Sequence, residues 1–183
     1  MVSAAVTVPQ PSPARSADAS DRLARAWRAL ASVPDPEIPV LSVVELGIVR
    51  DVVADASTLR VRVTPTYSGC PATDVIMRDM REALAEAGIG EVAIDIALAP
   101  AWTTDWIAPE GRRKLAAYGI APPGRVARID VSGISPLRRA MQVTCPRCAS
   151  SATTLIAQFG STACKALYRC DACREPFDYF KPY

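Results

Sequence analysis

The sequence of 183 residues contains no histidine. This absence excludes a Ser-His-Asp triad, a Cys-His pair, a two-histidine-one-carboxylate iron centre and the histidine-containing di-iron sites, because each of them needs an imidazole. It also removes the side chain that most often transfers protons near neutral pH. A Gly-rich dinucleotide fingerprint, a phosphate-binding loop and a nucleophile elbow are missing as well. We therefore expect a protein that is not an enzyme by itself.

Long apolar runs and strong charge are also lacking. No stretch approaches the roughly 20 consecutive apolar residues that span a bilayer, and the N-terminus lacks the regions of a secretory signal. The net charge is only +2, and the densest basic run, Arg112-Arg113-Lys114, is typical of a solvated helix face. A nucleic-acid-binding protein usually carries a stronger basic patch. The sequence thus predicts a soluble, cytoplasmic protein that binds neither nucleic acid nor membrane.

The chain is long enough for one ordinary domain and a small appendage. Hydrophobic periodicity predicts a compact α/β domain of the α+β kind, followed by a separate four-cysteine unit. The expected elements are a helix at 21–33 capped by Ser20, strands at 48–55 and 58–65, a helix at 73–87, a strand at 91–98, a helix at 109–118 and an edge strand at 125–131. The expected divisions are a disordered lead at 1–19, the α/β domain at 20–131, a linker at 132–140 and the cysteine-rich unit at 141–183.

Two C-x-x-C motifs near the C-terminus carry the clearest chemistry. Cys145 and Cys148 form the first, Cys170 and Cys173 form the second, and 21 residues separate them. Each motif can turn two thiolates toward one ion, and two motifs complete a tetrahedral shell at about 2.3 Å per zinc–sulfur bond. Disulfides suit a chain without an export signal less well, while iron or a cluster also accepts four sulfur ligands. We predict a structural Zn²⁺ ribbon.

Two further cysteines and an acidic loop are ambiguous. Cys70 precedes an expected helix, whose N-terminus would lower the thiol pKa and favour a reactive or metal-binding thiolate. A buried structural cysteine at a tight turn is an equal alternative. Cys164 is either a small buried apolar residue or a reserve ligand. Asp35 and Glu37 lie among prolines, either as plain loop residues or as weak contacts to a metal or partner.

Longer segments resemble known families. The chain resembles the SufT-type iron–sulfur maturation domain in DPEIPVLSVVELGIVRDV, VTPTYSGCPATDVI and EVAIDIAL. It is similar to the PaaD family, accessory subunits of the bacterial phenylacetyl-CoA epoxidase system, in AWTTDWIAPEGRRKLAAYGIAPP and FGSTACKALYRCDACREPFDYFKP. The likeness extends from about residue 20 to the C-terminus, and it implies an iron–sulfur-maturation-type α/β domain with a C-terminal zinc ribbon.

The resemblance also implies a role beside the oxygenase active site in phenylacetate degradation. In that family the oxygenase subunits hold a di-iron centre, a reductase subunit holds flavin and a [2Fe–2S] cluster, and the PaaD type assists cluster or iron insertion into them. Carried over by position, Cys70 and Asp35 form a candidate site for a transient cluster or iron. The two C-x-x-C motifs match the ribbon ligands, and Cys164 matches a cysteine of the tail segment.

Two other functions stay open at the level of sequence. One is a structural zinc-ribbon adaptor that holds the oxygenase and reductase subunits together. The other is a DNA-binding zinc-ribbon regulator, which the scattered charge disfavours. The oligomeric state is open too, and a homodimer is one assembly that the sequence allows.

Overall fold

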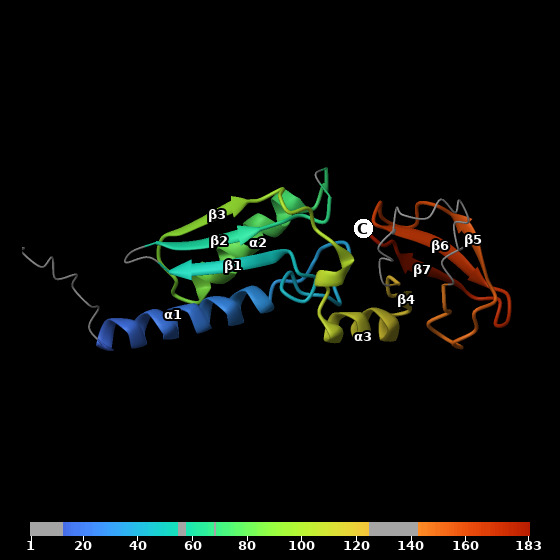
Figure 1. The fold of residues 1–183 in the computed structure, drawn as a ribbon, viewed down its shortest axis with the longest axis horizontal. Helices are drawn as coiled ribbons and strands as arrows, with labels where there is room; N and C mark the ends of the chain where they lie inside the picture. Colours follow the sequence, from blue (N-terminus) through green and yellow to red (C-terminus); the bar gives the residue numbers. More distant parts are fainter. Residues whose placement is uncertain (1–12, 55–57, 68, 125–142) are drawn as a thin grey trace, which may run out of the picture.

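A computed structural model describes residues 13–54, 58–67, 69–124 and 143–183 of the protein. Residues 1–12 of the predicted lead, the predicted edge strand at 125–131 and the predicted linker at 132–140 lie outside the described residues. The described residues form two β-sheets that lie end to end, with helices beside the first sheet (Figure 1). None of the helices in these ranges is long and apolar enough to cross a membrane.

The first sheet has the strand order β1-β2-β3, and its strands are β1 (Val49–Ala54), β2 (Leu59–Val63) and β3 (Val92–Ile96). β1 and β2 form an antiparallel hairpin, whereas β2 and β3 are parallel and are joined through helix α2 (Thr73–Glu86). Figure 1 shows α2 behind the sheet and helix α1 (Pro13–Ala31) along its β1 side. These elements confirm the predicted α/β architecture.

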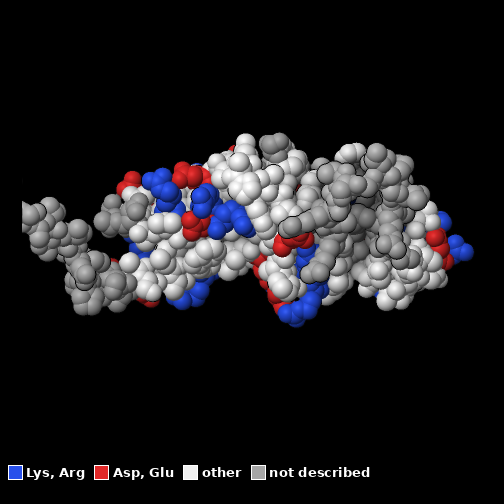
Figure 2. Space-filling model, in the orientation of Figure 1, with Lys and Arg blue, Asp and Glu red and all other residues white. Residues whose placement is uncertain are grey.

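The open face of this sheet is charged. Arg60 pairs with Asp95 and Arg62 pairs with Asp51, each across 3.1 Å from guanidinium nitrogen to carboxylate oxygen. Figure 2 shows the resulting mixture of basic and acidic side chains over β1–β3. The other side chains of β2 are buried, as the alternating pattern predicted.

Three predictions about these elements need correction. Helix α1 begins at Pro13 and not at 21, because the Ala-rich segment before Ser20 is compatible with a helix and continues it N-terminally. In the predicted strand at 91–98, apolar Val92, Ile94, Ile96 and Leu98 alternate with Ala93, Asp95 and Ala97, which predicts one buried face; this does not hold, because Ile96 is 47% exposed and Leu98 is 61% exposed at this sheet edge. Arg112 is no solvated helix residue, since its guanidinium donates to backbone oxygens of Pro123 and Thr104 (2.8 and 2.6 Å).

The second sheet forms the ribbon and has the strand order β4-β7-β6-β5. Three strands come from the tail, β5 (Thr153–Ala157), β6 (Lys165–Cys170) and β7 (Pro176–Phe180). The short strand β4 (Ile120–Ala121) follows helix α3 (Pro109–Tyr118) and pairs with β7 in parallel. In the sequence, residues 151–159 and 162–169 around Gly160 indicate the β5–β6 hairpin between the two C-x-x-C motifs, but no pattern indicates β4 or β7. Since β4 lies at the edge of this sheet, the preceding domain supplies an edge strand to the ribbon.

The two parts also share a hydrophobic core. Cys164 and Phe180 of the tail belong to the same buried cluster as the α/β domain, with exposed fractions of 4% and 0%. The Phe180 ring lies 6.1 Å from the ring of Trp102, whose indole N–H donates to the backbone oxygen of Leu46 (3.1 Å). The tail is therefore less separate from the α/β domain than the sequence suggested.

Candidate metal centres

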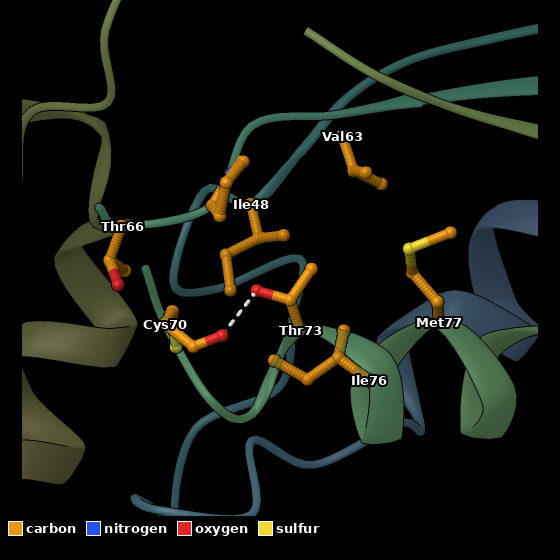
Figure 3. Close-up of a pocket in the computed structure, with 8 residues that line it drawn as sticks. Ile48, Val63, Thr66, Cys70, Thr73, Ile76 and Met77 are labelled. Carbon is orange, nitrogen blue, oxygen red and sulfur yellow. Dashed lines mark hydrogen bonds between the residues drawn. The ribbon is translucent and has the colours of Figure 1, made fainter. Parts of the chain in front are cut away.

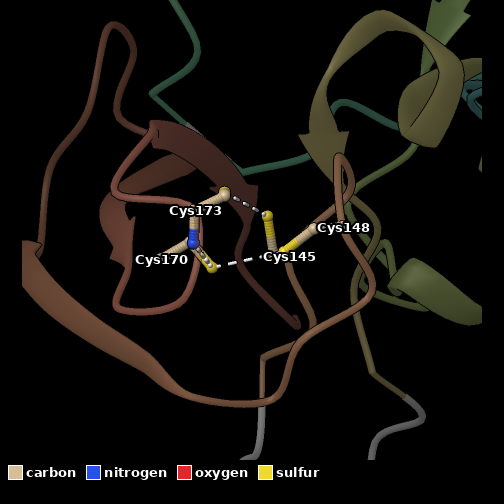
Figure 4. Close-up of side chains that lie close together, drawn as sticks. All are labelled: Cys145, Cys148, Cys170 and Cys173. Atoms are coloured by element: carbon tan, nitrogen blue, oxygen red, sulfur yellow. Dashed lines mark hydrogen bonds between the residues drawn. The ribbon is translucent and has the colours of Figure 1, made fainter.

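The four cysteines of the two C-x-x-C motifs come together in the ribbon (Figure 4). Their sulfur atoms all lie within 4.8 Å of one another. Cys145 Sγ lies 3.8 Å from Cys173 Sγ, and Cys148 Sγ lies 3.5 Å from Cys170 Sγ. A tetrahedral site with zinc–sulfur bonds of about 2.3 Å has edges of about 3.8 Å, so the spacing of the thiols fits one such ion.

Each motif is folded by its own backbone. The N–H of Cys145 donates to Ser150 (2.9 Å), and the N–H of Ala149 donates back to Cys145 (3.0 Å). In the second motif the N–H of Cys173 donates to the sulfur of Cys170 (3.5 Å). This amide hydrogen bond, helped by neighbouring thiols and a second amide, lowers the pKa of Cys170 to about 6. The lowered pKa favours the thiolate form of Cys170, which is the form that binds a metal.

Cys70 lies in the turn between β2 and α2. The backbone N–H and the hydroxyl of Thr73 donate to its carbonyl oxygen (3.2 and 2.9 Å), which fixes the turn before the helix. The residue is half-buried and lines an apolar pocket of about 10 Å³ with Ile48, Ile76 and Met77 (Figure 3). A pocket of this size holds no ligand larger than a water molecule.

The pKa of Cys70 shifts in the direction opposite to the prediction. Burial raises it, and the negative charges of Glu37 and Asp35 raise it further. The backbone N–H of Ala72 acts as the helix N-terminus was expected to act, but this opposing effect is smaller. The raised pKa therefore favours the thiol form of Cys70 over the thiolate.

Asp35 shapes the acidic loop. Its side chain is buried, and one carboxylate oxygen accepts the backbone N–H groups of Glu37 (2.9 Å) and Ile38 (2.8 Å). Burial raises its pKa, in spite of these two hydrogen bonds. Since that oxygen already accepts two backbone hydrogen bonds, the main role of Asp35 is to fix the backbone of the loop at Glu37.

Cys164 comes to this acidic loop from the far end of the sequence. Its Sγ lies 3.8 Å from a carboxylate oxygen of Glu37 and 3.0 Å from the hydroxyl oxygen of Thr162. Burial raises the pKa of Cys164 to about 11. The sequence identified Cys164 and Glu37 one by one but gave no sign that they meet, because 127 positions separate them and no local pattern links them.

Comparisons with known proteins cover most of the chain. Residues 131–181 match the family described as the PaaD zinc beta ribbon domain, and residues 23–96 match the family described as iron-sulfur cluster assembly protein. The chain is 52% identical over 155 residues to a candidate 1,2-phenylacetyl-CoA epoxidase subunit of the PaaD type from Escherichia coli K12, a match that covers 85% of this chain and 90% of the relative.

The α/β part has wider relatives. It is 37% identical over 90 residues to an Fe-S protein maturation auxiliary factor from Porphyromonas gingivalis, a match that covers 48% of this chain and 85% of that protein. A crystal structure of a domain of unknown function (DUF59) from Bacillus anthracis is similar with a TM-score of 0.52 and 24% identity, over 55% of this chain and 96% of that one. At that identity the likeness shows the fold alone.

Proposed function

Because the chain belongs to the PaaD family, we propose that it is a non-catalytic accessory protein that matures a phenylacetyl-CoA 1,2-epoxidase complex. It assists the insertion of an iron–sulfur cluster, or of iron, into the reductase or oxygenase subunits. A cytoplasmic location is part of the proposal, since insertion into newly made subunits takes place where they fold. The absence of histidine agrees with a role outside catalysis.

One observation carries this proposal. Within the part that matches the iron–sulfur assembly family, Cys70 is a half-buried thiol in the turn before α2, and the negative charges of Glu37 and Asp35 act on it from the acidic loop. A cation that reaches this thiol neutralises the two carboxylates and lowers the cost of losing the thiol proton. The metal is the cargo of this site, and a site with few fixed ligands releases it readily to a better one.

The ribbon has a different part in the proposal. Cys145, Cys148, Cys170 and Cys173 would hold Zn²⁺, which would supply folding free energy and no redox chemistry. The ribbon sheet includes β4 of the α/β domain, so the ion stabilises the packing of the two parts against each other.

The decisive experiment measures the client protein. Oxygenase and reductase subunits are produced with the wild-type chain, without it, or with Cys70→Ser, and iron and sulfide are measured in each purified subunit. Met77→Leu is the matched control, because it alters the same pocket and leaves the thiol in place. We expect reduced occupancy without the chain and with Cys70→Ser only. Full occupancy in every case would refute the maturation role.

A second candidate function is an adaptor that holds oxygenase and reductase together. Three large apolar side chains are exposed on or next to β5, namely Leu155 (44%), Ile156 (53%) and Phe159 (67%). Such a group suits contact with another protein. Stable co-purification of the chain with the assembled oxygenase would favour the adaptor, whereas release after maturation favours the assembly role.

A further inference from the structure

Strand β3 forms a free edge of the first sheet. Its neighbour on one side is β2, and no strand within the described ranges pairs with its other side (Figure 1). Natural proteins usually protect such an edge with proline, lysine or a bulge. The sequence of β3 contains neither proline nor lysine, and its pairing with β2 has no register shift. The outer side of β3 is therefore open to a further strand.

The hydrogen bonds to β2 show which backbone groups face this free edge. The N–H of Ala97 donates to the oxygen of Val63 (2.8 Å). The oxygen of Glu91 accepts the N–H of Leu59 (2.8 Å). In a parallel pair, successive residues direct their N–H and C=O groups to alternate sides of the strand. The odd-numbered residues of β3 therefore bond to β2, and the even-numbered ones direct these groups outward. The outward-facing residues are Val92, Ile94 and Ile96.

The side chains of β3 form an apolar row that is incompletely covered. The even-numbered residues of β3 are in register with the buried residues of β2, so their side chains lie on the same face of the sheet. Toward the end of this row Ile96 and Leu98 are exposed. On the opposite face are Ala93 and Asp95, and Asp95 already pairs with Arg60. A strand added at this edge would cover the apolar row without burying an unpaired charge.

We propose that β3 pairs with β3 of a second copy of the chain, antiparallel about a two-fold axis, so that the two sheets become continuous. Charge selects the register of this pairing. When it is centred on Ile94, all five residues of β3 are paired, and Asp95 lies opposite Ala93 of the second copy. A centre one residue earlier or later places Asp95 opposite Glu91 or opposite Asp95 of the second copy. Like charges that face each other directly destabilise a strand pair.

A second copy suits this edge because the strand is complementary to itself. In the chosen register Ile96 lies opposite Val92 of the second copy, so the two apolar rows join on one face of the continuous sheet. Asp95 keeps its partner Arg60 on the other face. The contact is one strand long, which is small beside the roughly 800 Å² per partner of a standard interface. We therefore expect a dimer that dissociates reversibly.

Sedimentation equilibrium of the full, zinc-loaded chain from about 1 μM to about 1 mM tests this contact. We expect the mass to rise reversibly from 19.5 kDa toward twice that value. Ala93→Lys places a positive charge opposite Asp95 of the second copy and should lower Kd. Ala93→Asp should raise Kd, and each change should be roughly two- to thirtyfold because the axis repeats the pair. Ile96→Pro removes an outward N–H without removing a bond to β2, so it should prevent dimerisation.

The stability of the monomer separates this contact from an effect on folding. Ala93 is in register with Arg60 of the same chain, so Ala93→Asp adds an attraction within the monomer and Ala93→Lys adds a repulsion. Denaturant titration at low concentration should therefore rank these two variants in the order opposite to their dimer affinities.

A substitution on the other sheet is the matched control for surface hydrophobicity. Ile156 is exposed on β5, which is an edge strand of the ribbon, and Ile156→Lys should leave the dimer unchanged. The β3 contact would be overturned by a chain that stays monomeric over the whole range, or by a dimer that Ile156→Lys removes. It would also be overturned if the dimer affinities of the two Ala93 variants followed the stabilities of their monomers.

Discussion

Replacing Phe180 by alanine should destabilise the α/β domain although Phe180 belongs to the ribbon. Its ring is fully buried, contacts Trp102 and lies in the core cluster of the α/β domain. Truncating a buried phenylalanine costs roughly 3–5 kcal/mol of unfolding free energy. For a chain of this length each kcal/mol shifts Tm by about 2–4 °C, so we expect a decrease of about 6–20 °C.

Tryptophan fluorescence can follow the unfolding of the α/β domain separately from that of the ribbon. The three tryptophans, Trp27, Trp102 and Trp106, all precede the ribbon, so denaturation followed by tryptophan emission measures the α/β domain. Cobalt substituted into the ribbon reports on the ribbon through its charge-transfer band. With one probe on each part, the two transitions show whether a substitution destabilises one part or both.

Phe177 is the matched control on the same strand. It is nearly as buried as Phe180, but it lies in the second core cluster and stacks on Tyr168 of the ribbon (6.0 Å between ring centroids). Phe177→Ala should lower the midpoint of the cobalt transition more than the midpoint of the tryptophan transition. A tryptophan transition that moves by less than about 1 kcal/mol in Phe180→Ala would refute the shared core, because it would show that this burial stabilises the ribbon alone.

Two other predictions address backbone strain and the thiol. In denaturant titrations, Gly47→Ala should lower the free energy of unfolding more than Gly88→Ala does. Both glycines have φ near +70°, a backbone conformation that costs alanine roughly 1–3 kcal/mol. A Cβ on Gly47 would also lie 2.6 Å from a backbone oxygen, whereas a Cβ on Gly88 meets nothing within 4 Å. Equal costs would contradict the close approach. The raised pKa of Cys70 lowers the thiolate fraction of this residue at neutral pH. Iodoacetamide should therefore modify Cys70 more slowly in the folded chain than in the unfolded chain, and the rate should rise with pH. Glu37→Gln removes one charge that raises this pKa, so it should speed the reaction near neutral pH, measured by mass spectrometry of the peptide; no acceleration would argue against that influence.

Local signals predicted most of the fold. The alternation of Leu59, Val61 and Val63 indicated a strand with one buried face, and the structure confirms it. Helix α3 has the predicted bounds, because Pro109 suits its first turn and Gly119, at φ 92°, ends it. The C-x-x-C spacing likewise indicated that four sulfur atoms would meet. Each of these features depends on residues close together in the sequence or on a motif with a fixed geometry.

The failures share a physical cause. Strand β4 has two residues and forms because β7 lies beside it, so no periodicity marks it. Ile96 and Leu98 continue an alternating pattern past the end of the covered sheet, and a pattern cannot report which elements cover a face. The predicted direction of the Cys70 pKa shift was wrong because burial of the thiol, which no local pattern reports, outweighs the amide at the helix end; the charges of Glu37 and Asp35 from another loop add to the effect of burial.

The two groups of cysteines differ in what holds them. In the ribbon, backbone hydrogen bonds within each motif hold the sulfur atoms close together. Cys70 and Cys164, by contrast, depend on the turn before α2 and on the segment before β6, and Cys164 reaches Glu37 only because the ribbon and the α/β domain share a core. The sequence could therefore indicate the ribbon site, whose ligands lie in two motifs of fixed geometry, but not the contact between Cys164 and Glu37, which depends on how two distant segments pack.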